Sequence, residues 1–204
     1  MRRLGTTSWQ ISVDGCSLLY DFPLWMRAAE RIEVPPDPFV PGPLDIERLP
    51  EPTTEPGSPA GLGEAWLGWW RTVIGLPRWT FELAGSPPMQ MDFSGPDVPG
   101  LTRWPELQRI ATRRWPEALR WHDGRKERDI PRQLPSSPHV GLAVQAVERE
   151  LGRPLRPIQL ELVLLPVRDG AIRRVTEERY LIPERIFDGP RMSEWLREEL
   201  RRLG

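Results

Sequence analysis

The chain of 204 residues contains a single cysteine, a single lysine and two histidines. Because Cys16 is alone, an internal disulfide framework and a cysteine-rich zinc site are excluded. With only His122 and His139, there is no His-x-x-x-His metal pair. The sequence also has no Gly-Lys pair, no Gly-x-Ser-x-Gly motif and no complete glycine-rich dinucleotide loop. We therefore expect no metal and no cofactor.

Long apolar segments are also missing. No run approaches the ~20 residues that span a bilayer, and no apolar stretch follows the basic start of the chain as in a secretory signal. At 39% hydrophobic and 28% charged residues, the composition is typical of a globular protein. The 27 arginines beside one lysine are typical of a GC-rich genome. These features predict a bacterial, cytoplasmic protein with no membrane partner.

Alternating apolar residues predict three β-hairpins. In the first, Asp14-Gly15 separates two alternating runs, as in a type I′ turn. In the last, Asp169-Gly170 separates the run 158–167, apolar on both faces and so central in its sheet, from 172–182. We predict an α+β fold with an antiparallel sheet built from hairpins at 8–20, 78–93 and 158–182.

Four or five short helices are expected around this sheet. Apolar residues at helical spacing predict the helices 61–75, 139–151 and 192–203, and Pro23 is expected to open a helix over 24–32. The stretch 103–122 carries Pro116 inside a helical pattern, so it predicts two short helices or one kinked near Thr112.

A proline-rich segment interrupts the regular structure early in the chain. Nine prolines lie between residues 35 and 59, and proline removes a backbone donor and restricts φ. We name residues 35–60 the proline strap. It is expected to have no helix and at most a short strand, and to lie against the protein. We predict one domain over 1–204, with a possible sub-division near 94–102.

Tryptophan and charge are both unevenly used. Ten tryptophans are hard to bury in a core of this size, and the adjacent Trp69 and Trp70 cannot both face one side of a helix. We expect at least one of Trp66, Trp69 and Trp70 to be exposed and to bind a partner protein. The alternative is that the proline strap covers them and leaves all three buried. Residues 1–100 have net charge −6 and residues 101–204 have +5. This asymmetry suits either attraction between the two halves of the chain or binding of a charged partner.

A second surface is predicted where arginines alternate with aromatic residues over 103–132. Cationic groups near aromatic rings are what single-stranded nucleic acid binding requires, although they also occur on ordinary solvated helices. The candidate residues are Arg103, Arg109, Arg113, Arg114, Trp115, Arg120, Arg125, Lys126 and Arg128.

One nucleophile remains for a catalytic hypothesis. Cys16 could act with His122 or His139 if either imidazole lies close in space, but a packed, inert thiol fits the same sequence. The leading prediction is a non-catalytic interaction subunit or adaptor of a bacterial intracellular assembly. The alternative is a nucleic-acid-binding accessory protein that uses 103–132, and the third is an enzyme whose site the sequence does not identify.

Overall fold

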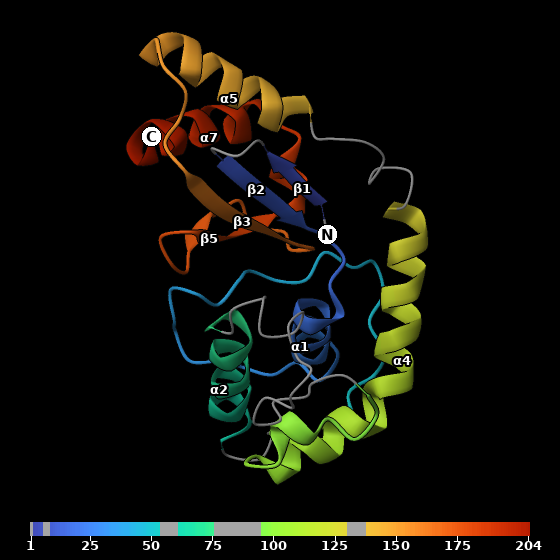
Figure 1. Ribbon diagram of the computed structural model, residues 1–204. Coiled ribbons are helices and arrows are strands. Elements are labelled where there is room, and N and C mark those ends of the chain that lie inside the picture. Colours follow the sequence, from blue (N-terminus) through green and yellow to red (C-terminus); the bar gives the residue numbers. More distant parts are fainter. Residues whose placement is uncertain (1, 6–8, 54–60, 76–94, 130–137) are drawn as a thin grey trace. The chain divides into compact units, whose positions relative to one another are not determined.

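A computed structural model describes residues 2–5, 9–53, 61–75, 95–129 and 138–204 (Figure 1). The chain forms two compact units. The sheet unit comprises Met1–Cys16 and Lys126–Gly204, and the helical unit comprises Ser17–Arg125. The predicted hairpin at 78–93 lies outside the described residues. That the chain is one domain, with a sub-division near 94–102, stays a prediction.

The sheet unit contains a five-stranded mixed sheet in the order β1-β2-β3-β5-β4. Its strands are β1 (Arg2–Gly5), β2 (Trp9–Asp14), β3 (Ile158–Leu165), β4 (Arg173–Arg174) and β5 (Arg179–Pro183). The central pairs β2–β3 and β3–β5 are parallel, whereas the outer pairs β1–β2 and β4–β5 are antiparallel. The α+β class holds and β3 is central as predicted, but the predicted antiparallel hairpin sheet is wrong.

The hairpin predicted at 158–182 fails because the chain reverses twice after β3. The first reversal follows Asp169, whose carboxylate accepts from the Ala171 N–H at 3.2 Å. The second follows β4, where the Thr176 hydroxyl accepts from the backbone N–H of Arg179 at 3.0 Å. The strand β5 therefore enters between β3 and β4 and runs parallel to β3. The second turn contains no Gly, Pro, Asn or Asp, so the sequence does not mark it.

The hairpin predicted at 8–20 is wrong in its second half. After β2 the chain forms helix α1 (Leu18–Ala29). The Ser17 carbonyl accepts from the backbone N–H groups of Tyr20 and Asp21 at 3.0 and 2.9 Å, which starts the helix before Pro23. The helix predicted over 24–32 therefore begins six residues earlier, with Pro23 inside it.

Two helices cover one face of the sheet: α5 (Pro138–Leu151) and α7 (Pro190–Leu203), which lie side by side in Figure 1. Both follow the predicted periodicity, and the short α6 (Glu184–Phe187) precedes α7. The core beneath them is almost entirely aliphatic. It includes Ile11 of β2, Leu160 and Leu162 of β3, and Leu196 of α7. Burial of this apolar area is the main stabilising term in the sheet unit.

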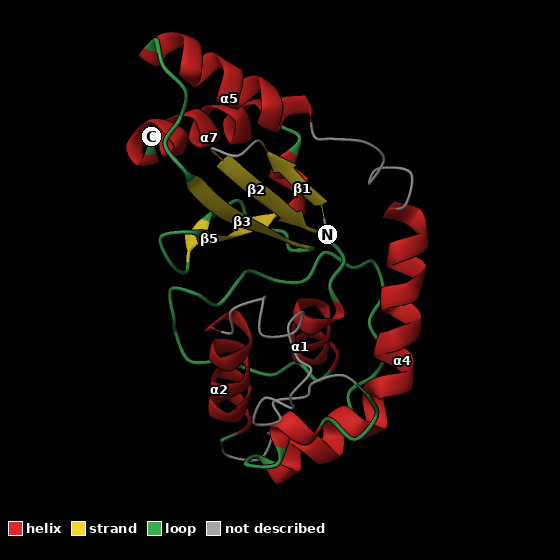
Figure 2. Cartoon of the chain, viewed as in Figure 1, coloured by secondary structure: helices red, strands yellow, loops and turns green. Residues whose placement is uncertain are grey.

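The described part of the helical unit contains α1, α2 (Leu62–Gly75), the one-turn η1 (Pro99–Leu101) and α4 (Pro105–Asp129) up to Arg125 (Figure 2). Of the two alternatives for 103–122, one helix is correct. It continues beyond Pro116 to residue 129 and changes direction along its length in Figure 1. In the described part of the chain, no helix has the length and apolarity needed to cross a bilayer.

The described part of the proline strap, residues 35–53, has no helix and lies on the helical unit, as predicted. The Arg27 guanidinium donates to the carbonyl oxygens of Pro41, at 2.8 Å, and Gly42. Leu44 is buried, and Arg71 forms an ion pair with Asp37 at 2.5 Å. An irregular segment with few backbone hydrogen bonds of its own is thus held by side chains of the helices.

Candidate catalytic cluster at the start of helix α1

A buried carboxylate, that of Asp21, lies in the first turn of α1. Its Oδ2 contacts Nδ1 of His122 at 2.8 Å. The Arg125 guanidinium also reaches it, with Nε 3.2 Å from Oδ2 and Nη2 3.2 Å from Oδ1. All three side chains are at most 8% exposed, so water contributes little to this cluster.

Helix α4 supplies both side chains that contact Asp21. His122 and Arg125 are three residues apart, so they lie on the same face of α4. The sequence alone places His122 at a helix C-terminus, but α4 continues to Asp129 and the imidazole lies inside the helix. The Arg125 guanidinium also lies over the Trp121 ring, 5.9 Å from its centroid.

The tautomer of His122 follows from its partner. A carboxylate that takes both donors of a guanidinium fork is an acceptor at each oxygen, so the hydrogen between Asp21 and His122 belongs to Nδ1. Nε2 is then the basic nitrogen of the neutral ring. This Asp–His arrangement is the one that orients a general base in serine and cysteine hydrolases.

Cys16 is bonded directly to Ser17, the N-cap of α1, at the turn that joins strand β2 to that helix. Its φ of 62° is in the left-handed region, which costs a residue with a side chain about 1 kcal/mol or more. The thiol is half-buried. The sulfur of Cys16 and the ligand atoms of Asp21 and His122 lie within 4.8 Å of one another.

Sulfur, carboxylate and imidazole can in principle hold a metal ion or act as a nucleophile with its base. The guanidinium of Arg125 decides between these uses. It already occupies both oxygens of Asp21, so a metal cation would have to displace a positive charge or lie beside it. The donor set therefore suits a thiol–imidazole pair better than a metal ion.

The tryptophans predicted to bind a partner are core residues. Trp66, Trp69 and Trp70 of α2 are each 0% exposed, so the expectation that one is exposed is wrong. The Trp66 and Trp70 rings stack at 5.7 Å, and the Trp70 Nε1–H donates to the Phe39 carbonyl at 2.8 Å. The proline strap covers the side of α2 that the sequence left at the surface. Partner binding through these residues stays a prediction without an exposed surface to support it.

The predicted nucleic-acid surface is divided by the structure. Arg114 and Arg125 are buried in ion pairs, and Arg109 pairs with Glu106 at 2.5 Å. Trp115 packs edge-on against Phe22 at 5.0 Å, and the Arg103 guanidinium lies over the Trp104 ring. The remaining exposed members are Arg113, Arg120, Lys126 and Arg128. The exposed acidic residues Asp123 and Glu127 lie among the last three of these on α4, so that part of the described face has mixed charge.

Arg114 belongs to a second buried ion pair that sequence reasoning missed. Its Nε donates to Glu30 at 2.5 Å, and its guanidinium also donates to the Glu51 carbonyl in the proline strap. Glu30 accepts from the Thr53 backbone N–H at 2.9 Å and hydroxyl at 3.0 Å. Burial raises the pKa of Glu30, but the hydrogen bonds from Arg114 and Thr53 lower it further, and the net direction is down. We call these four residues the strap clasp.

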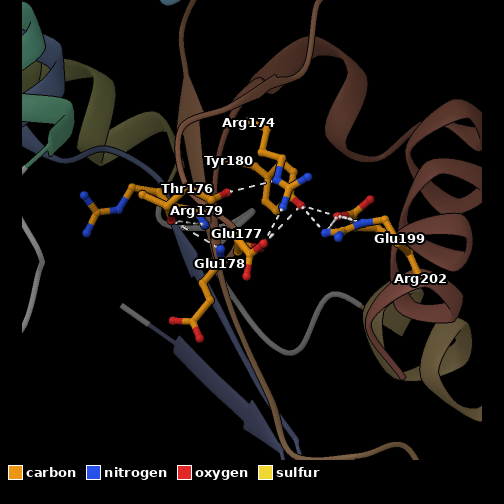
Figure 3. A network of polar contacts seen from close by, with 8 residues as sticks. All are labelled: Arg174, Thr176, Glu177, Glu178, Arg179, Tyr180, Glu199 and Arg202. Carbon is orange, nitrogen blue, oxygen red and sulfur yellow. Dashed lines mark hydrogen bonds and ion pairs between the residues drawn. The ribbon is translucent and has the colours of Figure 1, made fainter.

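A third polar network lies in the sheet unit and joins β5 to α7 (Figure 3). The Tyr180 hydroxyl donates to Glu199, which also accepts from Arg202. Burial and the hydrogen bond to Glu199 raise the pKa of Tyr180. Each group has a partner in the neighbouring element, so this network stabilises the docking of α7.

The other predicted catalytic residue, His139, lies at the start of α5 in the sheet unit, and its side chain is not described. Comparison with protein-family models, with curated proteins and with solved structures finds no match. A function for this chain is therefore inferred from its own geometry.

Proposed function

We propose that the protein is a cysteine-dependent acyl-transfer enzyme or hydrolase. Cys16 is the nucleophile, His122 is the general base and acid, and Asp21 orients the imidazole. The observation that carries this proposal is the buried Asp21–His122 pair at 2.8 Å with the Cys16 sulfur among its near neighbours. Geometry of this kind, more than residue order, identifies such sites on unrelated folds.

The local backbone supports the same role. Strand β2 ends at Asp14, Cys16 follows two residues later with a positive φ, and helix α1 begins at Leu18. A sharp turn of this kind between a strand and a helix presents the side chain at the turn. The first N–H groups of α1 lack intrahelical acceptors, and the helix dipole is positive there. Ser17, at the N-cap, forms no side-chain hydrogen bond to them. This helix end can stabilise negative charge that develops on the Cys16 sulfur during attack.

The chemical steps follow from these groups. Nε2 of His122 takes the thiol proton, and the Cys16 sulfur attacks the carbonyl carbon of an ester, thioester or amide. A carbon–sulfur bond forms, the bond to the leaving group breaks, and the leaving group takes the proton from His122. Water, or another acceptor nucleophile, then attacks the thioester with His122 as base, which releases the acyl product and restores the thiol.

Thiol reactivity tests this pair without a known substrate. Because the chain has one cysteine, the rate of alkylation by iodoacetamide reports on Cys16 alone. At neutral pH we expect the wild-type protein to react about tenfold faster than His122→Gln, since loss of the base lowers the thiolate fraction. His139→Gln is the matched control and should react like wild type. Equal rates in wild type and His122→Gln contradict the proposal.

The two binding functions predicted from the sequence are supported less well. The adaptor prediction relied in part on an exposed tryptophan of α2, and all three are buried. A nucleic-acid surface required a basic face, and the described face of α4 has mixed charge with two of its arginines buried. Retention on heparin that falls with added salt would favour the nucleic-acid function.

A further inference from the structure

We propose that Arg125 is a positioning residue that holds the Asp21–His122 pair in its base-competent tautomer. This inference rests on the proposed function and adds a fourth residue to it. Arg125 does not touch the reacting atoms in this proposal, because it acts only through the carboxylate of Asp21. The starting observation is that one carboxylate is shared between a guanidinium and an imidazole.

The contact geometry restricts rotation of the carboxylate. The Arg125 fork spans both oxygens of Asp21, with each nitrogen–oxygen distance 3.2 Å. A planar fork with two contacts fixes the plane of a carboxylate, whereas a single contact leaves it able to rotate. With that plane fixed, Oδ2 stays directed at Nδ1 of His122. The Nδ1–H tautomer is then favoured, and the lone pair is on Nε2.

Burial makes this restraint effective. Asp21 is 1% exposed, so water cannot readily replace a lost donor on the carboxylate. Arg125 is itself held among buried groups, 6% exposed and over the Trp121 ring. Lysine at this position would keep the positive charge, but it would lose both the fork and the flat surface that stacks on the indole. The substitution Arg125→Lys thus removes the two-contact geometry while it keeps the positive charge.

The test uses Arg125→Lys in the full chain, with Arg128→Lys as the matched control on the exposed part of the same helix. The first readout is the ¹⁵N NMR signature of the His122 ring at neutral pH, assigned with His139→Gln. The second is the rate of Cys16 alkylation by iodoacetamide. We expect the wild-type ring to be in the Nδ1–H form, and Arg125→Lys to show a mixed tautomer and a rate about tenfold lower. Arg128→Lys should match wild type in both.

Two results overturn the inference, and they differ from a failure of the proposed function. If Arg125→Lys folds and keeps the wild-type tautomer and rate, Arg125 does not position the pair. If the wild-type ring is in the Nε2–H form, the inference fails even when the variant does not fold. If alkylation is the same in wild type and His122→Gln, the proposed function fails, whatever tautomer the NMR spectrum shows.

Discussion

Replacement of Trp70 by alanine should destabilise the protein strongly, because the structure makes this residue part of the core. Its side chain is 0% exposed, stacks on Trp66 and donates to the Phe39 carbonyl. Burial of ~200 Å² at about 25 cal/mol per Å² gives an upper limit near 5 kcal/mol. Measured Trp→Ala changes in cores cost about 3–5 kcal/mol, so we expect a loss of about 4 kcal/mol in the free energy of unfolding.

Urea unfolding followed by far-UV circular dichroism measures this change. With an m-value of ~2 kcal/mol/M, the transition midpoint should fall by about 2 M. Trp70→Phe keeps most of the ring but leaves the Phe39 carbonyl without its donor, so it should cost about 1–3 kcal/mol. Leu142→Ala is the control, because Leu142 is 57% exposed and its loss should stay within ~0.5 kcal/mol. Equal midpoints for Trp70→Ala and Leu142→Ala would refute the assignment of Trp70 to the core.

Three further predictions concern the polar networks. Arg114→Ala removes the buried partner of Glu30, so it should cost about 3–5 kcal/mol and expose the proline strap to a glutamate-specific protease; cleavage no faster than in wild type would exclude the strap clasp. Because the pKa of Glu30 is lowered from its usual 4.5 on folding, its contribution is present above that pH and lost as the pH falls through the folded value. Glu30→Gln should therefore flatten the stability profile below about pH 4.5, and an unchanged slope would count against this. Tyr180→Phe should cost about 1–2 kcal/mol by urea unfolding, since Glu199 loses a donor; no change would mean that the network is not stabilising.

Helices with one apolar face could be read from the sequence. Apolar positions in α2, α5 and α7 repeat with the helical period, and all three helices form within a few residues of their predicted bounds. Helix α1 could not be read in this way. Every residue from Tyr20 to Met26 is buried, so no periodic face exists, and the alternation at 16–20 resembled a strand.

The pattern of alternating apolar residues also did not predict the direction of β5. Alternation identifies a strand, and Asp169-Gly170 identifies a reversal, but neither shows that the chain will reverse again at Thr176 before it pairs with β3. A strand that is apolar on both faces is typical of a parallel sheet, so the run in β3 pointed to parallel neighbours, but the Asp169-Gly170 turn was given more weight. The predicted sheet therefore has the correct central strand with the wrong partner direction.

The candidate site was only partly predictable. Cys16 and His122 could be named as a nucleophile and an imidazole because the chain has so few of either. Asp21 could not, because a carboxylate among apolar residues carries no local signal, and it lies about a hundred positions from its partners in α4. Arg125 was predicted to bind phosphate, whereas the structure places it on a buried carboxylate.

Acylation of Cys16 tests the central claim most directly. The full chain is mixed with p-nitrophenyl acetate at neutral pH, release of nitrophenol is followed by absorbance, and the protein is analysed by peptide mass spectrometry. We predict a burst of nitrophenol with an acetyl group on Cys16, an initial rate about a hundredfold lower in His122→Gln, and a wild-type rate in His139→Gln. No acetyl group on Cys16, or equal acetylation in His122→Gln and wild type, would contradict the account.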